Sequence, residues 1–526
     1  MESTEKNKTM SIIPKPVHLI SCEGYFKLTP QTVIAASGEA AVVARQLADM
    51  LSPATGFTLK VQASPLPNVP DIILAINPEL EPLGEEGYTL SVTTDSVHLQ
   101  SAGTAGLFYA AQSLRQLLPP AIFRETPAKG IDWVIPCVEI EDYPRFGWRG
   151  LMIDCGRSFM PKPAIKKIID LLALHKMNVL HWHLTDDQGW RIEIRKYPRL
   201  TKVGAWRKET VVGHLDWPVI ASKLKFDGKP HGGFYSQDDI REVVAYAKER
   251  HVGVLPEIEM PGHSEAAVAA YPELGNTGKQ IEVNTTWGIH ENIYNANEST
   301  ILFLQDVLAE VLELFPSPFI HVGGDEAPKK QWKASPAAQA RMKKLGLRNA
   351  EELQSYFIRR MDAYLTEHGR RLIGWDEILE GGLAPNATVM SWRGEKGGIA
   401  AAHAGHDVVM APNTYTYFDY NQSLSHKEPL AIGGYLPLRK VYLYEPIPKG
   451  LTAEEATHVL GAQGQLWTEY IPDLEHLEYM AFPRACALAE VVWTSAGNKD
   501  YADFKVRLAT HLKRLKELKV NYRPAK

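Results

Sequence analysis

Two adjacent carboxylates, Asp325 and Glu326, follow the short apolar run Phe319-Ile320 in the segment His-Val-Gly-Gly-Asp-Glu. The apolar run is typical of a buried strand, and Gly323 and Gly324 allow the backbone to turn sharply where it ends. Neighbouring carboxyl groups can be held in different protonation states, one neutral to donate a proton and one ionised to stabilise positive charge. The pair therefore predicts acid–base chemistry. A glycine–aspartate turn with a solvated glutamate is the alternative.

The elements that must position this pair recur along the chain from about residue 148. Eight short apolar runs alternate with helical patterns, which predicts a (β/α)₈ TIM barrel with long insertions. The runs lie at 150–154, 178–184, 252–258, 319–323, 372–375, 388–392, 407–411 and 459–467, and helices are expected at 161–175, 238–250, 299–314, 335–346, 349–368, 397–404 and 478–492. A doubly wound open sheet is the alternative, disfavoured because no glycine-rich nucleotide fingerprint follows an early strand.

The segment before the barrel has a different pattern. Residues 11–143 predict a small α+β domain, with strands at 72–76, 88–92 and 97–99 and amphipathic helices at 39–51 and 104–118. We interpret residues 121–144, which contain Pro and Trp, as a connector and assign residues 144–526 to the barrel domain. Residues 1–10 are polar, and we expect them to be disordered.

Composition limits the partners of the chain. Its 526 residues carry a net charge of −5 without a Lys/Arg block, which argues against nucleic acid. No apolar run is long enough to span a membrane. The first residues lack the apolar core of a secretory signal. We expect a periplasmic or secreted protein whose export signal is not included in the sequence, with the cytoplasm as the alternative. The oligomeric state expected is a monomer or a homodimer.

Three tryptophans, Trp375, Trp392 and Trp467, lie at predicted strand ends, where the working residues of a barrel are found. Aromatic faces stack on the apolar face of a pyranose, and carboxylates and guanidinium groups bind its hydroxyls. The composition therefore predicts a sugar pocket, with core packing as the alternative for each tryptophan. The other strand-end residues are Asp154, Arg157, His181, His183, Asp186, Asp187, Glu257, Glu259, His263, Asp376, Glu377, Arg393, Tyr415, Tyr417, Asp419 and Glu469.

His181 and His183 have the His-x-His spacing that binds a metal in some barrel hydrolases that attack amides. This is the rival class of enzyme. It would need more ligands from later strands, where only His263 and His321 lie near strand ends. The four cysteines are scattered without a CxxC pair, so they predict neither zinc nor disulfides. We expect no metal and no cofactor. A sugar-binding module without catalysis is a further alternative, disfavoured because both acids are present.

The chain resembles the family 20 glycoside hydrolases, the β-N-acetylhexosaminidases, across nearly its whole length. The resemblance rests on WRGLMID at 148–154, HWHLTDDQGWR at 181–191, PEIEMPGH at 256–263, HVGGDE at 321–326, GWDE at 374–377, SWRG at 391–394 and LWTE at 466–469. It implies a small α/β domain before a (β/α)₈ barrel. It also implies a glycosidase that hydrolyses terminal non-reducing β-linked N-acetylglucosamine or N-acetylgalactosamine from oligosaccharides such as chitooligosaccharides and from glycoconjugates, with retention of configuration.

The resemblance assigns Glu326 as the acid that protonates the glycosidic oxygen and then activates water, and Asp325 as the partner of the 2-acetamido group. Sequence neighbours cannot easily flank both faces of a sugar ring, so the usual retaining pair of carboxylates is not expected. The tethered acetamido oxygen would attack instead, forming an oxazolinium ion. Tyr417 would donate a hydrogen bond to that oxygen, with Tyr415 as its competitor. Whether Glu257, Asp186 or Glu469 faces Glu326 stays open.

The resemblance extends to the surroundings of the acid pair. Asp186 and His263 would form a polar chain that keeps the pKa of Glu326 high, with a core histidine as the alternative for His263. Trp375, Trp392 and Trp467 would wall the pocket, and Arg157, Asp419 and Glu469 would bind hydroxyls. Loops at 201–235, 271–298 and 412–458 would set the pocket width. They contain Trp206, Trp217, Trp287 and Tyr294 as candidates for a leaving-group site, with packing of the insertion on a small core of its own as the alternative for each. The natural glycan, the gluco or galacto preference, and release of a monosaccharide or a disaccharide stay open.

Overall fold

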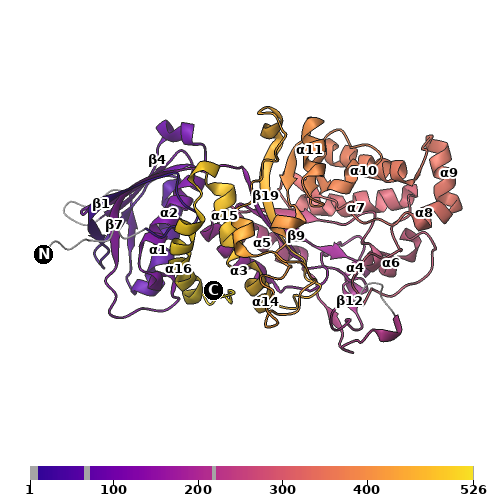
Figure 1. Ribbon diagram of the computed structural model, residues 1–526, viewed down its shortest axis with the longest axis horizontal. Helices are drawn as coiled ribbons and strands as arrows, with labels where there is room; N and C mark the ends of the chain where they lie inside the picture. Colours follow the sequence, from indigo (N-terminus) through magenta and orange to yellow (C-terminus); the bar gives the residue numbers. More distant parts are fainter. Residues whose placement is uncertain (1–9, 64–70, 216–220, 525–526) are drawn as a thin grey trace.

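A computed structural model describes residues 10–63, 71–215 and 221–524. The chain forms two domains side by side, a sheet domain built from the N-terminal residues and a barrel built from the rest (Figure 1). The expected disordered segment 1–10 lies outside the described residues except for Met10. Among the described residues, no helix combines the length and apolarity needed to cross a lipid bilayer.

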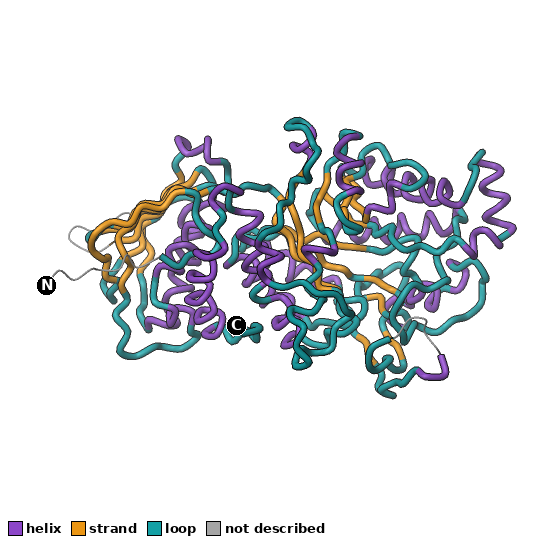
Figure 2. The backbone as a smooth tube through the Cα atoms, in the orientation of Figure 1, coloured by secondary structure: helices purple, strands orange, loops and turns teal. Residues whose placement is uncertain are grey.

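The N-terminal domain is a seven-stranded mixed sheet in the order β1-β7-β5-β6-β4-β2-β3. Helices α1 (Ala40–Thr55) and α2 (Thr104–Leu117) lie between this sheet and the barrel, next to the C-terminal helix α16 (Tyr501–Glu517) (Figures 1 and 2). The strands are β1 (His18–Lys27), β2 (Val33–Ala35), β3 (Lys60–Gln62), β4 (Asp71–Ile76), β5 (Tyr88–Val92), β6 (Ser96–Ser101) and β7 (Val134–Asp142).

The interpretation of residues 121–144 as a connector is wrong, because β7 crosses this segment and pairs antiparallel with both β1 and β5. Its second half alternates buried Val138 and Ile140 with exposed Glu139 and Glu141, the period of a strand with one face on the core. Pro136 lies within β7, and Pro127 and Pro144 lie on either side of it, so prolines masked the alternation in the sequence.

The second domain is a closed barrel of eight parallel strands, which confirms the predicted fold class. Its strands, in chain order, are β8 (Trp148–Asp154), β9 (Val179–His183), β14 (Gly253–Glu257), β15 (Phe319–His321), β16 (Arg371–Trp375), β17 (Thr388–Ser391), β18 (Val408–Met410) and β19 (Val459–Leu466). Each of the eight runs expected from the sequence contributes one strand. The carboxyl ends of these strands therefore meet at one mouth, where residues far apart in sequence come together.

Helices surround the barrel (Figure 2). They are α3 (Lys162–Leu174), α5 (Gln237–Lys248), α7 (Glu298–Leu314), α9 (Pro336–Leu345), α10 (Ala350–Glu367), α11 (Lys396–His403), α14 (Leu474–Ala481) and α15 (Arg484–Trp493). The single helix expected at 478–492 is divided in two at Pro483, because proline lacks the amide that would continue α14. Short elements in the loops are β10 (Thr185–Asp186), β11 (Gly189–Trp190), β12 (Trp206–Arg207), β13 (His231–Gly232), α4 (Arg199–Lys202), α6 (Glu265–Ala270), α8 (Lys330–Ala334), α12 (Asn413–Thr416) and α13 (Leu438–Tyr442).

Two buried ion pairs attach the N-terminal domain to the barrel. Arg149 lies 2.6 Å from Glu86, and Lys176 lies 2.8 Å from Asp142. Arg149 stands near the start of β8 and Lys176 just before β9, so the contact is at the amino ends of these strands. The N-terminal domain therefore leaves the mouth of the barrel open.

Candidate active site

A cavity of about 330 Å³ opens at the carboxyl ends of the barrel strands. It brings together most of the residues expected at the site from sequence, drawn from six different strand ends. These are Arg157, Asp325, Glu326, Trp375, Trp392, Tyr417, Asp419, Trp467 and Glu469. Its volume and its mixture of aromatic faces with a few polar groups are typical of a small-molecule site.

The backbone after β15 is sharply bent to present the acid pair. Gly323, Gly324 and Glu326 have φ angles of +67°, +98° and +43°. A side chain on Gly323 would collide with the carboxylate of Glu259, so this position requires glycine for space as well as for conformation. Glu326 holds a left-handed conformation that non-glycine residues rarely adopt, a form of local strain that is concentrated at functional sites.

His263 connects the acid pair to the interior of the barrel. Its Nε2 lies 3.5 Å from Glu326 Oε2 and 3.7 Å from Asp325 Oδ2. Its Nδ1 lies 3.4 Å from Asp186 Oδ1 and 3.2 Å from Asp187 Oδ2. His263 is therefore not an isolated core histidine, because both ring nitrogens face carboxylates.

The chain of polar groups continues inward from Asp186. Asp186 Oδ2 lies 3.0 Å from Arg157 Nη1 and 3.0 Å from His183 Nε2. His183 Nδ1 in turn lies 2.5 Å from Glu257 Oε2. Burial would raise the pKa of Asp186, but the charges of Arg157 and His263 outweigh burial and lower this pKa far below its ordinary value. Asp186 therefore stays ionised.

Glu257 is the centre of a buried histidine cluster. His181 Nε2 and His321 Nδ1 lie 2.9 Å and 2.7 Å from its carboxylate oxygens, and the indole of Trp375 donates to Oε1 at 2.8 Å. This cluster contains both histidines of the metal alternative. Both ring nitrogens of His183 face carboxylates, and those of His181 face Glu257 and, at 2.8 Å, the Gln463 amide. His181, Glu257 and His321 each bring one potential ligand atom within 4.8 Å of the others, so the metal alternative stays a prediction.

The pKa values of the pair differ from the expectation for Glu326. Burial would raise the Glu326 pKa, but the hydrogen bond and charge of His263 outweigh it and hold this pKa below its usual value. Burial raises the pKa of Asp325 to about 6, and Glu326 adds to the rise while His263 opposes it. The His263 pKa lies well above its usual value, because Asp186 outweighs burial. These directions favour a charged imidazolium at His263 beside the acid pair.

Aromatic side chains form the walls of the cavity. The rings of Trp375 and Trp467 have centroids 5.7 Å apart, and Trp392 lies 6.1 Å from Tyr417 with an angle of 20° between the planes. Tyr417 lines the cavity, whereas Tyr415 stacks on Tyr444 with centroids 4.8 Å apart and does not line it. The geometry thus separates the two tyrosines that the sequence left equivalent.

Several buried polar atoms of the cavity have no hydrogen-bond partner among the described residues: both carboxylate oxygens of Asp419, Oδ1 of Asp325 and Nε of Arg157. Burial and the neighbouring Glu469 raise the pKa of Asp419 well above its usual value. Burial likewise raises the pKa of Glu469 to about 6, against the opposing charge of Arg157. Buried polar groups require partners, and the hydroxyls of a sugar are both donors and acceptors.

The loops at the mouth contribute residues that the sequence did not single out. His214 stacks on Tyr470 with centroids 5.7 Å apart, and the Leu215 amide donates to the Tyr470 hydroxyl at 3.2 Å. Of the four aromatic residues considered for a leaving group, Trp287 lines the cavity, Trp206 and Tyr294 do not, and Trp217 lies outside the described residues. Tyr470 directly follows Glu469 and could have been found from that position, but no pattern in the sequence marks His214.

Comparison with known proteins shows the family of the chain. Residues 146–496 match the catalytic domain of glycosyl hydrolase family 20, and residues 9–143 match domain 2 of the same family. A β-hexosaminidase of Porphyromonas gingivalis is 44% identical over 98% of the chain, which spans 65% of the length of that relative. A β-hexosaminidase of Vibrio furnissii is 37% identical over 91% of the chain and 76% of the relative.

Solved structures agree with this assignment. The β-N-acetylhexosaminidase of Streptomyces coelicolor superposes with a TM-score of 0.84 at 31% identity, covering 99% of this chain and 98% of that one. The exo-β-N-acetylglucosaminidase of Vibrio harveyi, solved with N-acetylglucosamine, has a TM-score of 0.85 at 34% identity and covers 98% and 78%. The resemblance drawn from the motifs is confirmed, and the chain belongs to glycoside hydrolase family 20.

Proposed function

We propose that the chain is a retaining exo-β-N-acetylhexosaminidase that removes terminal non-reducing β-linked N-acetylglucosamine or N-acetylgalactosamine by substrate-assisted catalysis. One observation carries the proposal: a single imidazole nitrogen, His263 Nε2, lies within 3.7 Å of both Asp325 and Glu326. The two carboxylates therefore stand on the same side of the pocket. In this proposal a sugar bound there has its leaving oxygen and its 2-acetamido group on that side, so Asp325 and Glu326 do not flank the ring as the two carboxylates of the usual retaining enzyme do.

Glu326 is the proton donor in this proposal, and His263 supplies the proton. The imidazolium of His263 lies 3.5 Å from Glu326 Oε2 and is held charged by Asp186. A sugar seated over Glu326 excludes water and disfavours its carboxylate, which draws the proton from His263 toward Glu326. The protonated acid then transfers the proton to the glycosidic oxygen as the bond to the anomeric carbon breaks.

Asp325 and Tyr417 act on the acetamido group. The acetamido oxygen attacks the anomeric carbon within the same molecule, and such intramolecular reactions have effective concentrations of roughly 10⁵–10⁸ M. The oxazolinium that forms carries positive charge next to the ionised Asp325, while the Tyr417 hydroxyl donates to the acetamido oxygen. Water activated by Glu326 then attacks the anomeric carbon, which opens the oxazolinium ring and restores the original anomeric configuration.

The walls of the pocket support exo action. A cavity of about 330 Å³ lined by Trp375, Trp392 and Trp467 suits one terminal pyranose, and the unpartnered oxygens of Asp419 offer acceptors to its hydroxyls. Trp287 and the stacked pair His214 and Tyr470 lie at the same cavity and are the contacts proposed for the leaving group.

Hydrolysis of two aryl glycosides tests the proposal. An aryl N-acetyl-β-glucosaminide should be hydrolysed rapidly, and the matching aryl β-glucoside, which lacks the acetamido nucleophile, should be nearly inert. A thiazoline mimic of the cyclic intermediate should inhibit strongly. Comparable turnover of both glycosides, or a covalent hexosamine ester on a protein carboxylate during turnover, would exclude the mechanism.

A further inference from the structure

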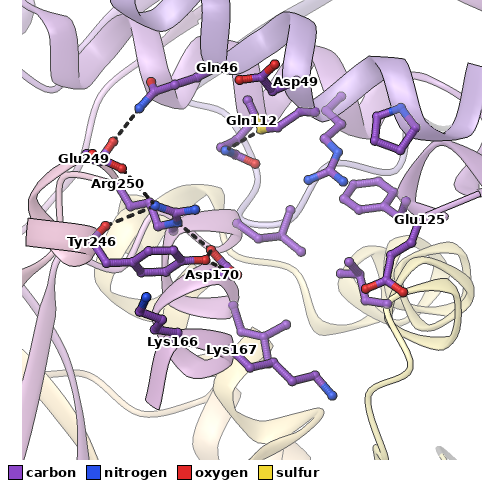
Figure 3. A pocket seen from close by; sticks show the side chains of 18 of the residues that line it. Gln46, Asp49, Gln112, Glu125, Lys166, Lys167, Asp170, Tyr246, Glu249 and Arg250 are labelled. Atoms are coloured by element: carbon purple, nitrogen blue, oxygen red, sulfur yellow. Dashed lines mark hydrogen bonds and ion pairs between the residues drawn. The ribbon is translucent and has the colours of Figure 1, made fainter. Parts of the chain in front are cut away.

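A second cavity, of about 710 Å³, lies between the two domains, away from the mouth of the barrel. One side is formed by α1, α2 and the short helix η2 (Pro120–Phe123) of the N-terminal domain, and the other by α3 and α5 of the barrel. Figure 3 shows Gln46 and Gln112 on one side of the space and Asp170, Tyr246 and Lys166 on the other. The cavity shares no lining residue with the catalytic site.

Arg115 on α2 is the unusual cation of this cavity. Its guanidinium carbon lies 4.1 Å from the centroid of the Phe123 ring, and its buried Nε has no hydrogen-bond partner among the described residues. No carboxylate within the described parts of the chain lies within ion-pair distance of it. The nearest acid that acts on it, Asp170, already binds Arg250 at 2.5 Å and the Tyr246 hydroxyl at 2.8 Å.

The other cations around the cavity are all paired. Lys166 lies 2.5 Å from Glu242, Lys167 lies 2.5 Å from Glu478, and Arg124 lies 2.7 Å from Glu517. Among the described residues, Arg115 is therefore the lining cation that forms no ion pair. Burial lowers the pKa of Arg115 to about 10, which still leaves the guanidinium charged at neutral pH.

Two glutamines add polar atoms that lack suitable partners. The Gln46 amide nitrogen donates to the Glu249 carbonyl at 2.7 Å, but its buried Oε1 has no partner among the described residues. Within the part of the chain that the structure describes, the buried Gln112 donates its amide only to the Met50 sulfur, at 3.4 Å, and sulfur is a weak acceptor. Buried polar groups in this state require a ligand or ordered water.

The rest of the lining selects the kind of ligand. Met50, Phe108, Phe123, Leu171 and Leu174 give the cavity an apolar wall beside the guanidinium. Asp49 and Glu249 line it as exposed acids and would repel a dianion such as phosphate. A single carboxylate on the ligand would match the guanidinium of Arg115, and an apolar body would match the apolar wall. An O–H or N–H donor would match Gln46 Oε1.

We propose that this interdomain cavity is a binding site for a small organic monocarboxylate, held by Arg115 and Gln112 and carrying an apolar body with a hydrogen-bond donor that reaches Gln46. Because the site includes residues of both domains, the ligand binds only the docked arrangement and stabilises it. The carboxylate of the ligand accepts hydrogen bonds from the guanidinium of Arg115, and such charge-assisted bonds are stronger than those between neutral groups.

The test uses the full chain and three probes of one shape: 4-hydroxyphenylacetate, its uncharged amide, and phenylacetate, which lacks the hydroxyl donor. Binding is measured by saturation-transfer NMR and by the shift in unfolding temperature at constant ionic strength. We expect 4-hydroxyphenylacetate to bind at millimolar concentration or below, phenylacetate to bind more weakly, and the amide to bind at least tenfold more weakly. A thiazoline sugar mimic should not displace the probe, and hydrolysis of an aryl substrate should be unchanged.

Variants assign the contact. Arg115→Met keeps the length of the side chain and its packing on Phe123, and it should lose probe binding at least tenfold without loss of hydrolysis. Gln112→Glu places a carboxylate in the lining with Arg115 and should abolish binding, because it would repel the carboxylate of the probe and compete for the guanidinium. The matched control Arg124→Met, at the rim, should bind as the wild type does. Equal binding of the amide, unchanged affinity in Arg115→Met or Gln112→Glu, displacement by the thiazoline, or no binding to the wild type would each overturn the proposal.

Discussion

His263 Nε2 lies 3.5 Å from Oε2 of Glu326, so the catalytic acid faces an imidazole that Asp186 holds in its charged form. A general acid is usually expected to have a raised pKa, and Glu326 differs from this expectation. The free Glu326 has a lowered pKa, and the proton is stored on its neighbour. Replacing His263 by Gln should therefore slow hydrolysis most for poor leaving groups and move the alkaline limb of the pH profile of kcat/KM to lower pH. An unchanged alkaline limb would contradict this storage role.

Glu326→Gln should lower kcat by roughly 10²–10⁴ on a disaccharide, because the glycosidic oxygen then has no proton donor. A dinitrophenyl glycoside, whose leaving group needs no proton, should lose far less in the first step. The comparison of the two substrates by steady-state and burst kinetics checks this. Wild-type rates on the disaccharide would show that another group is the acid.

Tyr417→Phe should lower kcat for acetamido substrates by roughly 10²–10³, the cost of removing one preorganised donor to a reacting oxygen. Tyr415→Phe is the matched control, because Tyr415 stacks on Tyr444 and does not line the cavity. Each variant lacks one tyrosine hydroxyl of the wild type, and the two positions are two residues apart. Equal losses in both, with folding verified by circular dichroism, would exclude a specific contact of Tyr417.

The pH profile should report Asp325. Its pKa is raised to about 6, chiefly by burial, and it must be ionised to stabilise the oxazolinium. Activity toward acetamido substrates should therefore rise as the pH increases through about 6, since kcat/KM reflects the free enzyme. Asp325→Asn, besides lowering the rate, should remove this acid limb. An acid limb that survives in Asp325→Asn would assign it to another group.

Glu257→Gln should destabilise the barrel by about 3–5 kcal/mol, because it removes one of the two carboxylate partners of the buried, charged His183. Glu257 and Asp186 raise the pKa of His183 to about 10 against the effect of burial. A raised histidine pKa stabilises the fold fully below its unfolded value of about 6.5, and this stabilisation is lost as the pH rises through about 10. The free energy of unfolding of the wild type should thus decline between these values, and that of Glu257→Gln should decline less.

Urea unfolding at several pH values measures this difference. Glu242→Gln is the control, because Glu242 is exposed and solvent screens its ion pairs with the half-buried Lys162 and Lys166. The same pH dependence in wild type and Glu257→Gln would show that the buried cluster does not couple protonation to folding.

The barrel could be predicted from the sequence because each of its strands carries a local signal, a short apolar run followed by a helical period and polar residues at the strand end. The acid pair and the three tryptophans were found by the same rule. The seven-stranded sheet was predicted less completely. Strand β7 was hidden by nearby prolines, and β2 and β3 have only three residues each, too short to show a period.

The residue types, their order and the closed barrel that brings strand ends together were determined by the sequence itself, because hydrophobic period and motif spacing are local properties of the chain. Three features were decided only by the tertiary structure: which tyrosine faces the pocket, that His181 and His183 turn to Glu257, and that His263 lies between Asp186 and the acid pair. Each depends on distances and burial among residues distant in sequence, and charge interactions follow those distances rather than the order of the chain.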